Sequence, residues 1–366
     1  MRYKQDLGEI LRKISVDVSD SILNTLKKMD ELGMKLLVVN QEGKFKSLIS
    51  IGDIQRAVIK GTDLQQSIVG ILRDKITICH DDQTDEEIEE SMIHNRAEFM
   101  PVLDTNNNIS RLVFWEDIIH NVDTTSNVID APVVIMAGGK GTRLRPLTNI
   151  IPKPLIPVGD KPIIEIIMET FGSYGIRKYF VIVNYKASMI KSYIEGLDNE
   201  EREISILKEE NEYGTCGSLT MLRGKIETSF FMTNCDTILD QDLSEVYNFH
   251  KENSNELTII GALKHYPIPY GMIEFEEGGK FIGITEKPEL TLAVNSGTYI
   301  LEPHLLDEVP ENRFFHITEL ISNITSRKGK VGVFPVSERS WLDIGEWAEY
   351  NRTQQFIAKR KRNDSF

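Results

Sequence analysis

The chain has 366 residues, of which 40% are hydrophobic and 27% are charged, and its formal charge at pH 7 is −14. This length predicts two or three domains that each bury a core, and this composition excludes a disordered chain. The acidic excess argues against a nucleic-acid-binding protein, because such proteins neutralise phosphates with a basic surface.

Cysteine spacing and hydropathy bear on the cellular compartment. The three cysteines, Cys79, Cys216 and Cys235, are odd in number and too widely spaced for a zinc motif, which predicts reduced thiols. The first residues lack the apolar segment of a signal peptide, and no apolar run approaches membrane-spanning length. We therefore expect a soluble cytoplasmic protein with no membrane partner.

Residues 1–123 contain an internal repeat. Segment 38–54 resembles segment 101–118, so that Asp53 recurs 64 residues later as Asp117 (117 − 53). In the first copy, Ser19 or Asp20 is predicted to cap an amphipathic helix, followed by a strand, a hairpin turn and a second strand. Each copy therefore predicts the order helix, strand, turn, strand, helix.

This duplication resembles a tandem pair of CBS domains, with an α+β fold, copies at 1–62 and 63–123, and a polar linker at 124–130. The resemblance implies an adenine nucleotide effector that regulates an attached enzyme. In that family a Ser/Thr-x-x-Asp after the second strand contacts ribose and phosphate, which implies Ser50 and Asp53, whereas the second copy keeps only Asp117. One nucleotide site is therefore expected. An Asp directly after a strand is also a common helix cap, and this remains the alternative role of Asp53.

An acidic cluster with a histidine follows in the second copy, formed by His80, Asp81, Asp82 and Asp85. Carboxylates at this position suit the positive end of a helix dipole, so a solvated helix start is expected. A metal site is the alternative.

Residues 131–356 alternate strand and helix patterns, which predicts a mainly parallel α/β sheet. We expect strands at 133–136 and 178–183 and helices at 162–174 and 187–197. This order begins a Rossmann-like nucleotide-binding fold, in which ligands lie at the carboxyl ends of the strands.

The first of these strands leads into a glycine-rich loop. Residues 133–148 read Val-Val-Ile-Met-Ala-Gly-Gly-Lys-Gly-Thr-Arg-Leu-Arg-Pro-Leu-Thr. Glycines at the end of a parallel strand let backbone N–H groups approach an anion. Arg143 and the later Lys153, in Pro-Lys-Pro-Leu, would flank a phosphate-sized cradle. The loop therefore predicts a phosphate site.

This loop and its continuation resemble the signature of the sugar-1-phosphate nucleotidyltransferases, Gly-Gly-x-Gly-Thr-Arg-Leu-x-Pro-Leu-Thr followed by Pro-Lys-Pro. The resemblance implies a GT-A-like fold over 131–356. The residues that it implies for nucleotide binding are Ala137, Gly138, Gly139, Gly141, Thr142, Glu209, Gly214 and Thr215. In relatives, the residue five positions before the glycine that corresponds to Gly214 reads the base edge. A carboxylate at Glu209 would accept hydrogen bonds from guanine N1–H and N2–H₂, which favours GTP. The alternative is that Glu209 faces solvent in an acidic hairpin with Glu210 and Glu212.

Two carboxylates resemble the metal ligands of that family. Asp236 follows an apolar stretch at 230–235, and Asp343 lies in a Trp-x-Asp-x-Gly segment. The resemblance implies that both bind Mg²⁺, which prefers oxygen ligands. Relatives usually have glycine before the first Asp, so we expect Cys235 to crowd this approach. Either carboxylate alone would also suit a turn or a cap.

Segments 270–275 and 284–288 resemble the sugar-binding hairpin of the family, and segment 294–299 resembles a further part of its sugar pocket. The residues implied to contact the sugar phosphate are Gly271, Glu286, Lys287 and Asn295. For Glu286 and Lys287, the alternative is that they form an exposed charged turn before Pro288.

The implied reaction converts an NTP and a sugar-1-phosphate into an NDP-sugar and pyrophosphate, and it needs positioning and charge stabilisation rather than a protein nucleophile. The implied catalytic residues are Arg143, Lys153, Asp236 and Lys287, with Mg²⁺ as cofactor. Pro-Lys-Pro-Leu resembles the guanylyl and cytidylyl branches, so mannose-, glucosamine- and heptose-1-phosphate are the expected substrates.

Two other functions remain open on the sequence. One is a cytidylyltransferase that acts on a non-sugar alcohol phosphate, and the other is a nucleotide sensor without catalytic activity. Since CBS pairs often dimerise, a homo-oligomer is expected. The basic tail at 357–366 is expected to be a solubilising helix end.

Overall fold

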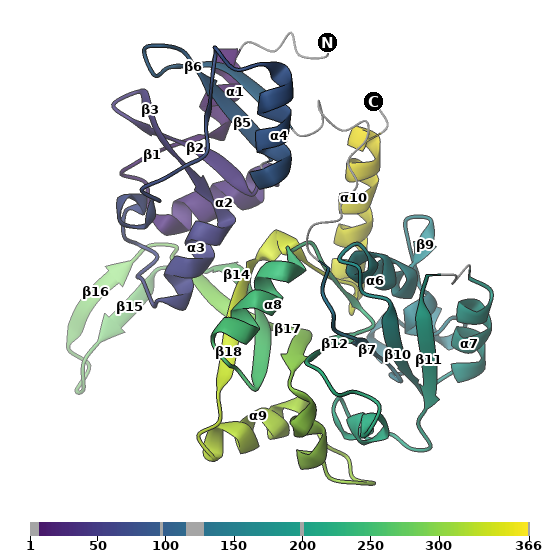
Figure 1. Cartoon of the computed structure of the whole chain (residues 1–366). Coiled ribbons are helices and arrows are strands. Elements are labelled where there is room, and N and C mark those ends of the chain that lie inside the picture. The colour runs from purple at the N-terminus through teal and green to yellow at the C-terminus, as the bar shows by residue number, and fades with distance from the viewer. Residues whose placement is uncertain (1–6, 96–97, 115–127, 198–200, 365–366) are drawn as a thin grey trace. The chain divides into compact units, whose positions relative to one another are not determined.

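The computed structural model describes residues 7–95, 98–114, 128–197 and 201–364, which group into two compact units within 1–123 and 124–366 (Figure 1). Within these ranges, every helix falls short of the length and apolar character that crossing a membrane requires.

The N-terminal unit contains two similar three-stranded sheets. Their strands are β1 (Ser15–Asp17), β2 (Leu36–Gln41) and β3 (Lys44–Ser50), and β4 (Cys79–His80), β5 (Phe99–Leu103) and β6 (Ile109–Phe114). In each sheet the first pair is parallel and the second antiparallel. Ser15 pairs with Val38 and Cys79 with Val102, which are 64 residues apart (79 − 15, 102 − 38), so the structure shows the internal repeat. The two hairpins differ in register by one residue.

Helices cover these small sheets. They are α1 (Leu7–Ile14), α2 (Ile22–Leu32), α3 (Ile51–Ile59) and α4 (Asp85–Asn95). The predicted cap of α2 was wrong, because the cap is Ser21, whose hydroxyl accepts from the Asn24 N–H at 3.1 Å. Asp20 instead accepts a hydrogen bond from the Asp17 N–H at 2.8 Å, which closes a turn before the helix. The helix therefore begins one residue later than a cap at Asp20 would place it.

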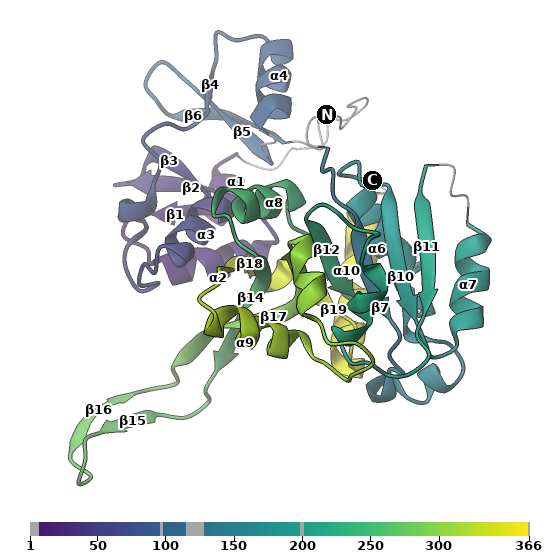
Figure 2. The same cartoon turned by 60° about the horizontal axis from the view of Figure 1, so that its bottom comes forward.

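A seven-stranded sheet forms the centre of the C-terminal unit (Figure 2). Its strands are β7 (Val133–Ala137), β10 (Lys178–Val183), β11 (Glu203–Lys208), β12 (Phe230–Asn234), β14 (Leu257–Pro267), β17 (Glu289–Leu301) and β18 (Val331–Ser337). Their order is β11-β10-β7-β12-β17-β14-β18, and only β17 runs against the others. The mainly parallel sheet is thus confirmed. Because β10 and β12 flank β7 on opposite sides, the carboxyl ends of β7 and β12 form a switch point, where ligands of such sheets bind.

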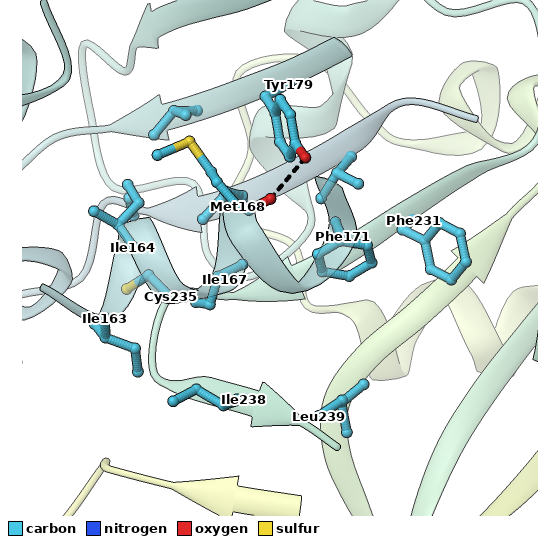
Figure 3. Packing of buried hydrophobic residues seen from close by; sticks show 14 of the residues in the cluster. Ile163, Ile164, Ile167, Met168, Phe171, Tyr179, Phe231, Cys235, Ile238 and Leu239 are labelled. Atoms are coloured by element: carbon cyan, nitrogen blue, oxygen red, sulfur yellow. Dashed lines mark hydrogen bonds between the residues drawn. The ribbon is translucent and has the colours of Figure 1, made fainter. Parts of the chain in front are cut away.

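Both faces of the sheet are buried, which explains the uninterrupted apolar runs of its strands. Val133 and Ile135 pack into one hydrophobic cluster, whereas Val134 packs into another. Helix α6 (Ile163–Gly172) lies in the first cluster, and the buried Tyr179 hydroxyl donates to the Met168 carbonyl at 2.9 Å (Figure 3). The remaining helices are α7 (Ala187–Glu195), α8 (Leu243–Glu252), α9 (Ile317–Ser326) and α10 (Trp347–Asp364).

Two pairs of shorter strands matter for function. β13 (Thr237–Leu239) pairs with β19 (Trp341–Asp343), directly after β12. β15 (Met272–Phe275) and β16 (Phe281–Thr285) form a hairpin beyond the ends of β14 and β17, and both views show it projecting away from the large sheet (Figures 1 and 2).

Candidate active site

The glycine loop follows β7 and is tight on one side and open on the other. A Cβ built on Gly138 would lie 2.7 Å from Glu209 Oε2, so a side chain there would require the Glu209 carboxylate to move. Gly141 has a φ of 61°, and its Cβ would lie 2.8 Å from Thr148 Cγ2. Gly139 has open space on its Cβ side. The loop is thus packed against its own unit at both ends and accessible in the middle.

The two predicted metal ligands lie together at the end of β12. The pairing of β13 with β19 sets Asp343 opposite Thr237, next to Asp236. A Cβ on Gly345 would lie 2.9 Å from Asp343 Oδ1 and 3.3 Å from Asp236 Oδ2. Burial, and then the charge of Asp236, raise the pKa of Asp343. The carboxylates therefore share one partly buried location and repel each other.

Two predicted cations flank this carboxylate pair. Lys153 is 8% exposed and forms an ion pair with Asp236 Oδ2. Arg143 Nη2 lies 3.3 Å from the same Cβ position on Gly345, and its Nη1 donates to Glu346 Oε1 at 2.8 Å. The loop, both cations and both carboxylates therefore converge, as the family resemblance implies. Removing one partner of a buried ion pair typically costs about 3–5 kcal/mol, so Lys153 and Asp236 depend on each other.

The carboxylate pair fits a magnesium ion. Mg²⁺ binds hard oxygen ligands and commonly takes one or two protein carboxylates together with substrate phosphates. Asp236 and Asp343 offer such oxygens at one location, and burial together with the charge of Asp236 raises the pKa of Asp343. A divalent cation there would relieve their repulsion.

A second grouping of possible metal ligands has another explanation. Ligand atoms of Glu256, His304 and Glu308 lie within 4.8 Å of one another. Arg327 forms ion pairs with both glutamates, and its hydrogen bonds lower the pKa of Glu256 to about 2. The guanidinium already supplies the positive charge, so this grouping is an ion-pair network.

Glu209 lies directly beneath the glycine loop. It is only 6% exposed, so the alternative of a solvent-facing acidic hairpin was wrong. The Ser218 hydroxyl donates to Oε1, and the Asn184 amide donates to Oε2 at 3.4 Å. Burial raises the pKa of Glu209 to about 7. Since a carboxylate has about four acceptor positions, two of them have no side-chain donor within the described residues.

The segment that contains Gly214 and Thr215 is fixed to the loop before α9. Gly214 has a φ of 79°, and a Cβ on it would lie 2.8 Å from the Phe315 carbonyl oxygen. The N–H groups of Cys216 and Gly217 both donate to that oxygen at 3.1 Å. The Thr215 hydroxyl accepts from the Ile317 N–H of α9 at 3.1 Å and lies 3.4 Å from His316 Nδ1, so it too is joined to this part of the chain.

Cys235 does not crowd the site, and this prediction was wrong. Its side chain turns into the hydrophobic core beside Ile163, Ile167 and Ile238 (Figure 3). It is 5% exposed, and burial raises the pKa of its thiol to about 12. Cys235 and Asp236 form the turn between β12 and β13, in which Cys235 faces the core and Asp236 pairs with Lys153.

The predicted sugar-side residues divide into two groups. Asn295, in β17, donates to the Tyr299 hydroxyl at 2.6 Å and accepts from the Gly297 N–H at 3.1 Å. Gly271 and Glu286 lie together at the base of the β15–β16 hairpin, because a Cβ on Gly271 would lie 2.8 Å from Glu286 Oε2. Glu286 and Lys287 are exposed, and within the described residues no hydrogen bond or ion pair joins them to the carboxylate pair.

In the N-terminal unit, Ser50 and Asp53 occupy the start of α3. The N–H and hydroxyl of Ser50 donate to Asp53 Oδ2 at 2.8 and 2.7 Å. Asp53 is 3% exposed and forms ion pairs with Arg56 and Arg73. The capping role is thus present, and the nucleotide role stays a prediction. Asp117 lies outside the described residues.

Of the acidic segment 80–85, only Asp85 lies in α4: His80 ends β4, and Asp81 and Asp82 lie in the turn before the helix. Thr84 and Glu87 form reciprocal hydrogen bonds of 2.9 and 3.3 Å, and Asp85 pairs with Arg111 at 2.9 Å. Among the described residues, the side chains of this segment do not form one of the carboxylate and histidine clusters that could hold a metal ion.

Comparison with known proteins identifies the family. Residues 132–360 match the nucleotidyl transferase family, and residues 7–60 match the CBS domain. The chain belongs to the nucleotidyl transferase family. It is 31% identical over 225 residues to mannose-1-phosphate guanylyltransferase 1 of Arabidopsis thaliana, covering 59% of this chain and 62% of that protein. It is 32% identical over 222 residues to mannose-1-phosphate guanylyltransferase catalytic subunit beta of Xenopus tropicalis, covering 58% and 61%.

This nucleotidyl transferase thus covers less than two thirds of the length of those relatives. Its fold is also similar to the crystal structure of HddC from Yersinia pseudotuberculosis complexed with GMP-PN. The TM-score is 0.50 at 24% identity, over 62% of this chain and 99% of that chain.

Sequence reasoning missed three residues of the nucleotidyl transferase site. Glu346 holds Arg143, while Ser218 and Asn184 hold Glu209. Glu346 directly follows the Trp-x-Asp-x-Gly segment, so its position could have indicated that it belongs to the site. For the other two, no spacing indicates that their side chains turn toward the same carboxylate.

Proposed function

We propose that this chain transfers a nucleotidyl group from an NTP, with GTP favoured, to a sugar-1-phosphate and releases pyrophosphate. One observation carries the proposal: Lys153, Asp236, Asp343 and Arg143 meet beside an accessible glycine loop at the switch point of the sheet. A phosphate chain needs this combination of cations, carboxylates and close backbone approach.

The reaction requires one displacement at phosphorus. An oxygen of the sugar phosphate attacks the α-phosphorus of the NTP, the new P–O bond forms, and the bond to the β-phosphate oxygen breaks, so that pyrophosphate leaves with the electron pair. Lys153, held by Asp236, is placed to stabilise charge on the α-phosphate. Arg143, which is exposed and tethered by Glu346, is placed to bind the departing pyrophosphate.

The chemistry that a bound Mg²⁺ supplies is neutralisation of charge on the phosphate oxygens. Asp236 and Asp343 are the residues that would hold it. The main-chain N–H of Gly345 donates to Asp343 Oδ1 at 2.6 Å and orients this carboxylate.

The choice of GTP rests on Glu209. Its two other acceptor positions match the adjacent N1–H and N2–H₂ donors of guanine, whereas uracil and thymine would present carbonyl oxygens beside a carboxylate. Guanylyl transfer also agrees with the names of the relatives of this chain, and mannose-1-phosphate is their named substrate. We extend the expected substrates to glucosamine- and heptose-1-phosphate, with Gly271, Glu286, Lys287 and Asn295 on the sugar side.

The test is pyrophosphate release by the full chain, with and without Mg²⁺, for GTP, ITP, ATP, CTP, UTP and dTTP against a panel of sugar-1-phosphates and phosphocholine. We expect Mg²⁺-dependent turnover with GTP and one of the sugar phosphates. Turnover with phosphocholine and CTP would establish the non-sugar cytidylyltransferase instead. Nucleotide binding without turnover in any mixture would establish a sensor.

For the N-terminal unit we propose an adenine nucleotide effector bound near Ser50 and Asp53. Arg56 and Arg73, which both contact Asp53, supply positive charge for its phosphates. Calorimetric titration with AMP and ATP tests this, and Asp53→Asn should weaken the binding while basal turnover is unchanged. If neither nucleotide binds the wild-type chain, Asp53 is only the cap of α3.

A further inference from the structure

The β15–β16 hairpin has one wholly apolar face. Its register pairs Ile273 with Ile284 and Phe275 with Phe281. The members of each pair lie directly opposite and so share a face, and Ile273 and Phe275 lie two apart on β15. A register shift between the two pairs brings Phe281, three residues before Ile284, to the same face, and we call these four side chains the hairpin face. They are 57, 59, 68 and 62% exposed, in that order, although such side chains are normally buried.

The arm that carries the hairpin exposes further large apolar side chains. At the outer ends of β14 and β17, Tyr266 pairs with Leu290, and all of Tyr266, Leu290 and Leu292 are at least 40% exposed. Tyr270 and Ile282 are 75% and 55% exposed. If nine large side chains each expose about half of ~200 Å², the arm leaves on the order of 900 Å² of apolar surface open. The largest such patch on a typical monomer is about 300–600 Å².

We propose that the arm, with the hairpin face at its centre, is the contact between two copies of this chain, related by a two-fold axis. The area of the whole arm fits, because a stable interface buries about 800 Å² on each partner, and the hairpin face alone supplies roughly half of it. A two-fold contact places one surface against itself, and the hairpin face is built of like pairs, Ile with Ile and Phe with Phe. Its four side chains carry no charge, and Glu286 lies beside Ile284 at the base of the hairpin. A two-stranded hairpin is also only marginally stable without a partner surface.

The contact has a consequence at the base of the hairpin, and this consequence rests on the proposed function. Gly271 and Glu286 pack together where β15 and β16 leave the sheet, and Lys287 follows directly. Docking of the hairpin would fix the positions of these residues. The KM for the sugar-1-phosphate is therefore expected to rise when the dimer is diluted apart, while the KM for GTP stays constant.

The first experiment measures the mass of the full chain by sedimentation over a wide concentration range. We expect a dimer for the wild type and a monomer for the double variant Ile273→Glu with Phe275→Glu. The matched control is Met189→Glu on α7, an apolar side chain that is 41% exposed in the same unit and should stay dimeric. Circular dichroism and melting verify folding. A monomeric wild type, or a double variant that stays dimeric through another surface, overturns the proposal.

A second variant tests the contact without removing it. The native cysteines Cys79, Cys216 and Cys235 are all buried, so an added surface thiol is the accessible one. Phe281→Cys should be cross-linked into a dimer by a short bis-maleimide, whereas Met189→Cys should not. Equal cross-linking of both would contradict a contact at the hairpin face. Neither experiment requires turnover, so a failure of the proposed function would not be mistaken for a failure of this contact.

Discussion

Glu209 illustrates what a single buried residue contributes to this site. Its carboxylate is held by Ser218 and Asn184 and lies against Gly138, which are separated from it along the chain by 9, 25 and 71 residues (218 − 209, 209 − 184, 209 − 138). Sequence patterns place Glu209 at the end of a strand, but they do not reveal that side chains from other elements enclose it. Its burial and its pKa of about 7 were therefore beyond sequence-based prediction.

The raised pKa predicts a pH effect on GTP binding. The ionised carboxylate accepts both guanine N–H groups, so the KM for GTP should fall as pH rises through about 7. Glu209→Gln should raise this KM roughly 10–100-fold, the loss of one charged hydrogen bond, and remove the added pH dependence. Initial rates measured from pH 5.5 to 8.5 check this. Titration of GTP itself affects the wild type and the variant equally, so the comparison between them isolates the effect of Glu209. A variant with the pH profile of the wild type would exclude Glu209 from base recognition.

The same shift has a stability consequence. A carboxyl group whose folded-state pKa exceeds its ordinary value keeps its proton in the folded protein after the unfolded chain has lost it. Unfolding then releases a proton, and stability falls as pH rises from about 4.5 to about 7. Glu209→Gln should therefore be more stable than the wild type above pH 7, by on the order of 3 kcal/mol at most, and equal to it below pH 4.5. Urea titrations at both pH values measure the difference; a less stable variant at pH 8 contradicts it.

Arg143 is expected to act on the reaction and not on the fold. Its side chain is 61% exposed, and its ion pair with Glu346 should contribute no more than about 1 kcal/mol to folding. Arg143→Ala should lower kcat roughly 10²–10³-fold with a nearly unchanged melting temperature. The matched control is Arg111→Ala, which breaks a similar exposed pair with Asp85 and should leave turnover intact. Full turnover of Arg143→Ala would remove this residue from the mechanism.

At the level of elements, the apolar runs decided what could be predicted. The strands β7, β10 and β12 and the helix α6 are encoded by contiguous apolar residues, so their positions were confirmed within one or two residues. The pairing of β13 with β19 joins segments about 100 residues apart and carries only three residues on each side. Such a contact has no local signal, and only the family resemblance pointed to Asp236 and Asp343 as neighbours.

The segment at Gly214 should be sensitive to a single methyl group. A Cβ there would meet the Phe315 carbonyl at 2.8 Å in addition to the strain of a φ of 79°. Gly214→Ala should therefore destabilise the protein by about 1–3 kcal/mol and raise the KM for the nucleotide. Gly224→Ala is the matched control, since its φ is 69° but its Cβ side is open. Denaturant unfolding and initial rates compare them, and equal effects of the two substitutions would argue against the close contact.

At the scale of the whole molecule, the division into two compact units predicts two unfolding transitions in calorimetry. A ligand that binds one folded unit raises the transition of that unit by mass action. GTP with Mg²⁺ should shift one transition, and AMP or ATP should shift the other. A single transition that both ligands move together would show that the units unfold cooperatively.

The close approach of Gly138 to Glu209 also constrains the evolutionary history of the chain. With only 2.7 Å between a Cβ at position 138 and Glu209 Oε2, neither position can enlarge unless the other retreats. The two positions should covary among relatives: where position 138 gains a side chain, position 209 should be shorter or uncharged. Such lineages would be the ones in which the choice of base has changed.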